Sequence, residues 1–186
     1  MGKILITAFE PFGGSGVNTS ALVLEKLPDR IGGYAAEKAL LPVVFGKAAE
    51  TALRYPADAV FLLGEAGGRN TVTPERRGRN LRDARIPDNA GNKPEQEKIL
   101  PDAPEEYLSV FPLEEIIARM RAEGYGIALS EDAGTYVCND TFFFTGIRSA
   151  VPAQFIHVPA KPEQAGEYAR TAERFIALCM EGAAAV

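Results

Sequence analysis

The sequence predicts an α/β domain with a largely parallel sheet, and two observations indicate this class. Segments with strand and helix patterns alternate through the first third of the chain, as in sheets whose parallel strands are joined by helices. Residues 59–63 form a continuous apolar run between Asp58 and Gly64, which suits a strand covered on both faces. In such domains ligands bind at the carboxyl ends of the strands.

The first half of the chain justifies this class element by element. Residues 3–8 are a short β-rich run that breaks into a glycine-rich loop. Asn18 or Thr19 can cap a helix that ends near Leu27, before a Pro-Asp pair. The next expected elements are a strand at 34–44, a helix at 46–54, the apolar strand at 59–63 and an extended piece at 71–73.

The second half of the chain continues the pattern after an irregular excursion at residues 83–96, a kind of segment that is usually functional or mobile. Residues 112–121 form an amphipathic helix that Gly124 closes. The remaining expected elements are a strand at 127–129, a helix at 141–147 that follows a turn around Cys138, a strand at 153–159 and a final helix at 162–180.

Size and composition narrow the class of protein. The 186 residues fit one domain, 1–186, and no linker or repeat divides them. A net charge of −5 with interspersed signs argues against nucleic acid as the main partner. No segment is apolar enough to span a bilayer, and the first residues turn polar too early for a signal peptide. We therefore expect a cytoplasmic protein that binds neither nucleic acid nor membrane.

Five arginines form a local exception to the mixed charge. They are either an anion-binding face or, more simply, part of a polar connection between strands. They lie within ten positions and are Arg76, Arg77, Arg79, Arg82 and Arg85.

Cys138 and His157 are the candidates for chemistry. Cys138 follows a glycine-bearing turn at the expected start of a helix, where free N–H groups and the helix dipole lower a thiol pKa. His157, the only histidine, ends a short buried strand. Cysteine catalysis needs such an imidazole and a third group that orients it, for which Glu75 is the candidate. The alternative is that both are inert core residues, as we interpret Cys179 to be.

The glycine-rich loop at residues 9–16 allows two interpretations. Gly13, Gly14 and Gly16 could cradle an anion, but the loop lacks the lysine and spacing of the known phosphate-binding motifs. Phe9 and Phe12 could instead wall a small flat pocket for an uncharged ring, although two such aromatic residues are core residues about as often.

Seven motifs, distributed over nearly the whole chain, match one known family in their order and spacing. They are residues 9–14, 41–43, 67–69, Glu75-Arg76 with Asn80, 83–89, Ala133-Gly134 with Tyr136 and Cys138-Asn139, and 155–159. With these motifs the chain resembles the pyroglutamyl peptidase I family, cysteine peptidases that remove an N-terminal pyroglutamate. The resemblance implies a three-layer α/β/α domain, phosphorylase- or hydrolase-like, with a twisted, mixed and mostly parallel sheet.

The resemblance also implies roles for the reacting residues. Cys138 attacks the carbonyl, His157 acts as base and then as acid, and Glu75 orients the imidazole. Arg85, within the motif at 83–89, is implied to stabilise the oxyanion together with the backbone N–H of Cys138, and such a donor contributes about 3 kcal/mol. The implied reaction uses no metal or cofactor.

For the substrate, the resemblance implies that Phe9 and Phe12 sandwich the lactam ring, with Asn18 and Val137 nearby. The implied partners are small peptides with an N-terminal pyroglutamate, and the protein is expected to be a homo-oligomer, either a dimer or a tetramer. The segment after Pro159 is shorter than in the family pattern, because residues 161–164 lead almost directly into the last helix.

Two positions depart from the family pattern. Glu65 stands where many bacterial relatives have glutamine, and an ionised carboxylate cannot donate a hydrogen bond. If its side chain meets the lactam carbonyl, binding is weakened or becomes pH dependent; if only its backbone does, the change is silent. Gly78 stands where alanine is common, which we expect to be neutral.

Two other functions stay open on the sequence. One is a relative that keeps the pocket but has altered specificity or only a binding role, against which the intact Cys138, His157 and Glu75 count. The other is an enzyme on the same scaffold that uses the glycine loop and the arginines for a phosphorylated ligand.

Overall fold

The computed structural model describes residues 2–183 and has a six-stranded sheet in the order β2-β3-β1-β4-β8-β5. Four central strands are parallel, and they are β1 (Lys3–Phe9), β3 (Tyr34–Leu41), β4 (Ala59–Ala66) and β8 (Ala153–Pro159). The two edge strands are antiparallel, and they are β2 (Arg30–Ile31) and β5 (Thr73–Pro74). The expected α/β class with a mixed, mostly parallel sheet is confirmed.

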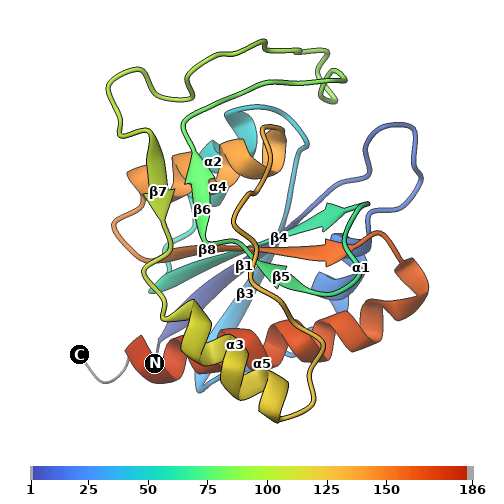
Figure 1. The fold of residues 1–186 in the computed structure, drawn as a ribbon, viewed down its shortest axis with the longest axis vertical. Helices are drawn as coiled ribbons and strands as arrows, with labels where there is room; N and C mark the ends of the chain where they lie inside the picture. The colour runs from blue at the N-terminus through green and yellow to red at the C-terminus, as the bar shows by residue number, and fades with distance from the viewer. Residues whose placement is uncertain (1, 184–186) are drawn as a thin grey trace.

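Helices cover both faces of this sheet (Figure 1). One face carries α1 (Thr19–Lys26), α3 (Leu113–Ala122) and α5 (Ala165–Ala183), the last preceded by the 3₁₀ turn η1 (Pro162–Gln164). The other face carries α2 (Lys47–Ala52) and α4 (Val137–Arg148). None of the helices within residues 2–183 is long and apolar enough to cross a membrane.

Strand alternation divides the core between the two faces. Ile4 and Ile6 of β1 pack in the cluster under α1, α3 and α5, whereas Leu5 and Phe9 pack in the cluster under α2 and α4. In β8 the same alternation places Phe155 on the α4 face, so His157, two positions later, belongs to that face too. The register pairs His157 with Gly64 of β4, at the carboxyl ends of both strands.

Three parts of the fold differ from the sequence expectations. A separate two-stranded sheet pairs β6 (Arg77–Arg79) with β7 (Glu106–Leu108), and β2 was also not expected. The expected strand at 127–129 is wrong, because this stretch makes only an isolated bridge from Ile127 to Val72. These segments are two or three residues long or rich in arginine, so apolar periodicity does not identify their pairing.

Gly78 of β6 lies so close to α4 that the expectation of neutrality fails for this chain. A Cβ at this position would lie 2.9 Å from the backbone N and 3.1 Å from the Cα of Phe143. Gly78→Ala is therefore expected to destabilise the fold by about 1–3 kcal/mol through overpacking. The midpoint of urea unfolding measures this, with Gly67→Ala as control, because a Cβ at Gly67 meets no atom within 4 Å. Equal midpoints for the two variants would contradict the prediction.

Candidate active site

Cys138 is the second residue of α4 and follows a turn that contains Gly134. Gly134 adopts a φ of 83°, a left-handed conformation that glycine accommodates easily, and its N–H donates to Oδ1 of Asp132 at 2.9 Å. No side chain caps the N-terminus of α4, which begins at Val137. The N–H groups of its first turn therefore have no intrahelical acceptor and surround the Cys138 backbone with donors.

His157 faces Glu75 across the end of the sheet. Its Nδ1 lies 2.7 Å from Oε1 of Glu75, and both side chains are buried, with 6% and 0% of their surface exposed. The backbone N–H of Glu75 donates to the carbonyl of Phe155 at 2.9 Å, which fixes Glu75 beside β8. The Phe155 ring packs against the imidazole, with 4.8 Å between ring centroids. Because Nδ1 is directed to the carboxylate, Nε2 remains for the thiol.

The protonation of His157 is set by its two partners. Burial lowers the pKa of His157, but hydrogen bonds to Cys138 and Glu75, together with their charges, outweigh burial and raise it to about 9. The imidazolium is therefore the favoured form of the ring at neutral pH. Its contribution to stability is present below the ordinary pKa of 6.5 and is lost as the pH rises through about 9.

Arg69 contacts the same oxygen of the Glu75 carboxylate as His157 does. Its Nη2 donates to Oε1 of Glu75 at 3.2 Å, to Oγ of Ser130 at 2.8 Å and to the carbonyl of Asp132 at 3.1 Å. Sequence reasoning placed Arg69 in a motif but gave it no role. Its position just after the apolar strand β4, where functional loops belong, was the available signal.

The predicted substrate residues lie around one small cavity that is partly open to solvent. Its lining residues are Phe9, Phe12, Asn18, Val43, Glu65, Tyr136, Val137 and Cys138. The structure therefore gathers all five predicted substrate residues beside the proposed nucleophile. Val43 and Tyr136 were missed as lining residues, although both lie in the motifs that carry the resemblance.

Three aromatic rings, those of Phe9, Phe12 and Tyr136, line this cavity. Phe9 packs against Phe155, with 6.3 Å between ring centroids, and Phe12 lies 6.1 Å from the ring of Tyr136. The Tyr136 hydroxyl donates to the carbonyl of Pro87 at 3.0 Å, so the excursion supports this wall. A lining of this kind suits a flat uncharged ring.

Asn18 and Glu65 form the polar corner of the cavity. Asn18 caps α1, because its Oδ1 accepts from the N–H of Ser20 at 3.0 Å, and its Nδ2 donates to the carbonyl of Glu10 at 3.0 Å. Oε2 of Glu65 accepts from the N–H of Thr19 at 2.6 Å, also at the start of α1. The Glu65 side chain thus lines the cavity while one of its oxygens is held by the helix.

Gly64 is a site residue that sequence reasoning missed. A Cβ at this position would lie 3.0 Å from Sγ of Cys138 and 2.6 Å from the Phe155 ring. The strand run that ends in glycine thus lets Sγ of Cys138 approach the sheet closely. The signal was the abrupt change from leucine to glycine at the carboxyl end of the apolar run.

Arg85 does not join the cavity. It is exposed on the excursion, does not line the cavity, and forms no hydrogen bond or ion pair among residues 2–183, so its role in the oxyanion site stays a prediction. The other arginines of the cluster each pair with a carboxylate, in the pairs Arg76 with Glu114 and Glu131, Arg77 with Glu106, Arg79 with Asp132, and Arg82 with Asp140. These pairs favour the polar connection over the anion-binding face.

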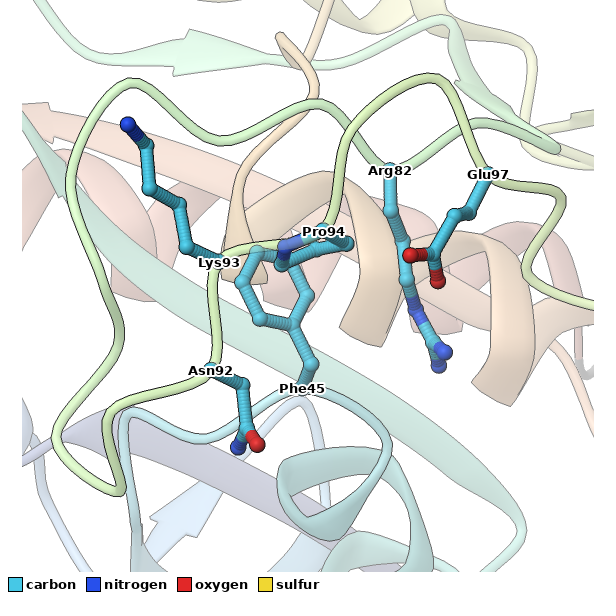
Figure 2. Close-up of a pocket in the computed structure, with 6 residues that line it drawn as sticks. All are labelled: Phe45, Arg82, Asn92, Lys93, Pro94 and Glu97. Atoms are coloured by element: carbon cyan, nitrogen blue, oxygen red, sulfur yellow. The ribbon is translucent and has the colours of Figure 1, made fainter.

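A second, polar hollow lies behind the aromatic wall. Figure 2 shows its lining residues, which are Phe45, Arg82, Asn92, Lys93, Pro94 and Glu97. The ring of Phe45 meets that of Tyr136 edge-on at 5.4 Å, so the hollow shares this wall with the cavity beside Cys138. Arg82 pairs with buried Asp140 of α4; burial raises the pKa of Asp140, and the guanidinium opposes this rise. The Arg82–Asp140 ion pair therefore anchors the helix that carries Cys138 to this hollow.

The described residues contain no group of three or more His, Cys, Asp or Glu side chains that could hold a metal ion. An α/β fold that sets a helix-borne cysteine and a carboxylate-bound histidine beside an apolar cavity defines a cysteine hydrolase. The family model for pyroglutamyl peptidase matches residues 2–184, and the chain belongs to this family.

Individual relatives agree with this membership. The pyrrolidone-carboxylate peptidase of Staphylococcus saprophyticus is 43% identical over 87% of this chain and 80% of the relative. That of Gloeobacter violaceus is 41% identical over 97% and 92%. The crystal structure of Bacillus amyloliquefaciens pyroglutamyl peptidase I superposes with a TM-score of 0.89 at 32% identity, covering 97% of this chain and 98% of that one. The pyrrolidone carboxyl peptidase of Thermococcus litoralis gives a TM-score of 0.90 at 32% identity, with 97% and 94% covered.

Glu65→Gln tests the polar corner of the cavity. A glutamine keeps an oxygen for the N–H of Thr19 and adds an N–H₂ donor for a ring carbonyl. We expect KM for a pyroglutamyl amide to fall by about 2- to 10-fold, the effect of one hydrogen bond. Steady-state kinetics at neutral pH measures this, with exposed Glu10→Gln as control. An unchanged KM would contradict the prediction.

Proposed function

We propose that Cys138, His157 and Glu75 form the catalytic triad of this pyroglutamyl peptidase, a cysteine omega-peptidase that removes N-terminal pyroglutamate from peptides. One observation carries the assignment of the triad. The Glu75-bound imidazole lies on the sheet face that α4 covers, and its pKa is raised by Cys138 and Glu75 against the effect of burial; Cys138 begins α4 beside a cavity lined by three aromatic rings. This arrangement satisfies the geometric roles of nucleophile, base and orienting group.

The first half of the reaction forms an acyl-enzyme. Sγ of Cys138 attacks the carbonyl carbon of the pyroglutamyl residue while the imidazolium of His157 holds the thiol proton. The oxyanion that develops accepts from the backbone N–H of Cys138, and Arg85 is the proposed second donor, which turns inward from its exposed loop. His157 then protonates the amine, the C–N bond breaks, and a thioester remains on Cys138.

The second half hydrolyses the thioester. His157, now neutral, takes a proton from water as the water oxygen bonds to the carbonyl carbon. The C–S bond breaks, the thiolate returns beside the imidazolium, and pyroglutamate leaves. Glu75 holds Nδ1 throughout and thereby keeps Nε2 directed at the reacting atoms.

Selectivity for the lactam follows from the cavity. A pyroglutamyl ring carries no charged amine, so aromatic walls and a few polar groups accept it. A free amino terminus would lose its hydration without gaining a partner in this largely apolar space, which disfavours ordinary N-terminal residues. A cytoplasmic location and a homo-oligomer, dimer or tetramer, remain predictions, as does a single domain over residues 1–186.

Hydrolysis of two matched coumarin amides tests the proposal. Pyroglutamyl and prolyl amides have the same five-membered ring, but only the prolyl compound has a charged amine. We expect the pyroglutamyl amide to be cleaved at least about 10³-fold faster in kcat/KM. Binding of the pyroglutamyl compound without release of coumarin by folded, reduced protein would indicate a binding role instead. Equal cleavage of both compounds would contradict the selectivity argument.

A further inference from the structure

We infer that Arg69 is a positioning residue that holds the Glu75 carboxylate against Nδ1 of His157 while the imidazole is neutral, and that its main effect is on hydrolysis of the acyl-enzyme. The inference rests on the proposed function. It begins from one shared atom: Oε1 of Glu75 is 2.7 Å from Nδ1 of His157 and 3.2 Å from Nη2 of Arg69. The Glu75 side chain is fully buried, and its Oε2 has no hydrogen-bond partner among residues 2–183.

A buried carboxylate of this kind depends on a positive partner. Without one, burying its charge in a poorly hydrated site is costly. Two positive groups face Glu75, the imidazolium of His157 from β8 and the guanidinium of Arg69 from the turn after β4. The carboxylate of nearby Asp132 accepts from Arg79. Arg69 contacts only the backbone carbonyl of Asp132.

The two positive groups behave differently during the reaction. His157 is an imidazolium before acylation, but it becomes neutral when it gives its proton to the leaving amine. Arg69 is charged throughout, because a guanidinium does not lose its proton at working pH. During the life of the thioester Arg69 is therefore the cation that balances the Glu75 carboxylate. A carboxylate held against Nδ1 in turn makes His157 a stronger base toward water.

Two further hydrogen bonds fix the position of the Arg69 side chain. Its Nη2 is fixed by Ser130 and by the carbonyl of Asp132, which lie 61 and 63 positions along the chain. Only 30% of the Arg69 side chain is exposed, so little of its charge is screened by solvent. Arg79 provides a matched comparison, because it pairs with the Asp132 carboxylate at 3.1 Å and anchors the same segment without contacting Glu75.

The experiment separates the two half-reactions in stopped-flow release of coumarin from a pyroglutamyl amide. For Arg69→Met we expect a burst of one amine per enzyme followed by a slow phase, with kcat reduced about 10- to 100-fold and KM reduced with it. Acid-quenched samples should show the mass of an attached pyroglutamyl group. Arg69→Gln, which keeps donors for Ser130 and Asp132 but has no charge, should behave in the same way. Arg69→Lys should abolish the burst and recover most of kcat.

Arg79→Met is the control, with no burst and an unchanged ratio of kcat to KM. Absence of a burst in both neutral Arg69 variants, or full activity of Arg69→Gln, would overturn the inference, because the charge would then be unnecessary. A burst in Arg79→Met would also overturn it, since the segment rather than the charge would be responsible. Failure of the wild type to release coumarin would refute the proposed function itself, which separates the two conclusions.

Discussion

Cys138→Ala is expected to reduce kcat for a pyroglutamyl amide by about 10⁶-fold, because it removes the atom that forms the thioester. The backbone donors of α4 and the aromatic cavity stay in place, so KM should change much less than kcat. Cys138 is partly exposed and packs at the margin of the core cluster under α2 and α4. Because it is not one of the buried residues of that cluster, the variant should fold. Steady-state hydrolysis and thermal unfolding measure the two effects together.

Cys179→Ala is the matched control. Cys179 is buried in the opposite cluster, and burial raises the pKa of its thiol well above the ordinary value. The control variant should keep its activity and lose only some stability. In the wild type, iodoacetamide should modify Cys138 and leave Cys179 unmodified in the folded protein. Activity retained by Cys138→Ala, or lost only in Cys179→Ala, would reject Cys138 as nucleophile.

Glu75→Gln should give the second largest effect, a loss of about 10⁴-fold in kcat, because an amide neither fixes the tautomer of His157 nor balances its charge. The pH profile of kcat/KM should move in a defined direction in this variant. Glu75 is one of the two groups that outweigh burial and raise the pKa of His157 to about 9. In the wild type, kcat/KM should therefore fall on the alkaline side near pH 9, and in the variant this fall should move to lower pH, toward 6.5.

The same shift should appear in the stability of the protein. The stability that this ring contributes should be lost at lower pH in the variant than in the wild type. Glu131→Gln is the control, because this exposed carboxylate pairs with Arg76 and does not contact His157. An alkaline limb that stays near pH 9 in Glu75→Gln would show that another group controls His157.

The parts of the fold that the sequence predicted are those with local patterns. The apolar run of β4, the cap of α1 and the strand that bears His157 each depend on neighbouring residues, and the structure has all three. The pairing of β6 with β7 was not predictable in this way. It depends on contacts such as Gly78 against α4, where the absence of a side chain is the determining feature.

The site shows the same division. Motif order in the chain was sufficient to name Cys138, His157 and Glu75, and the structure brings the three together. The contact of Arg69 with Glu75 requires the end of β4 to meet a segment about sixty positions away, which no local pattern encodes. Arg85 marks the opposite case, since its motif is clear but its exposed side chain is not held near Cys138.

Trapping the acyl-enzyme tests the central claim most directly. Reduced wild-type protein is mixed with a pyroglutamyl amide, quenched in acid within the first turnover, digested and analysed by mass spectrometry. The triad predicts a pyroglutamyl group on the peptide that contains Cys138, sensitive to hydroxylamine as a thioester is, and none on the peptide that contains Cys179. Amine release with no modified Cys138 peptide at any quench time, or a modification at another residue, would contradict the account.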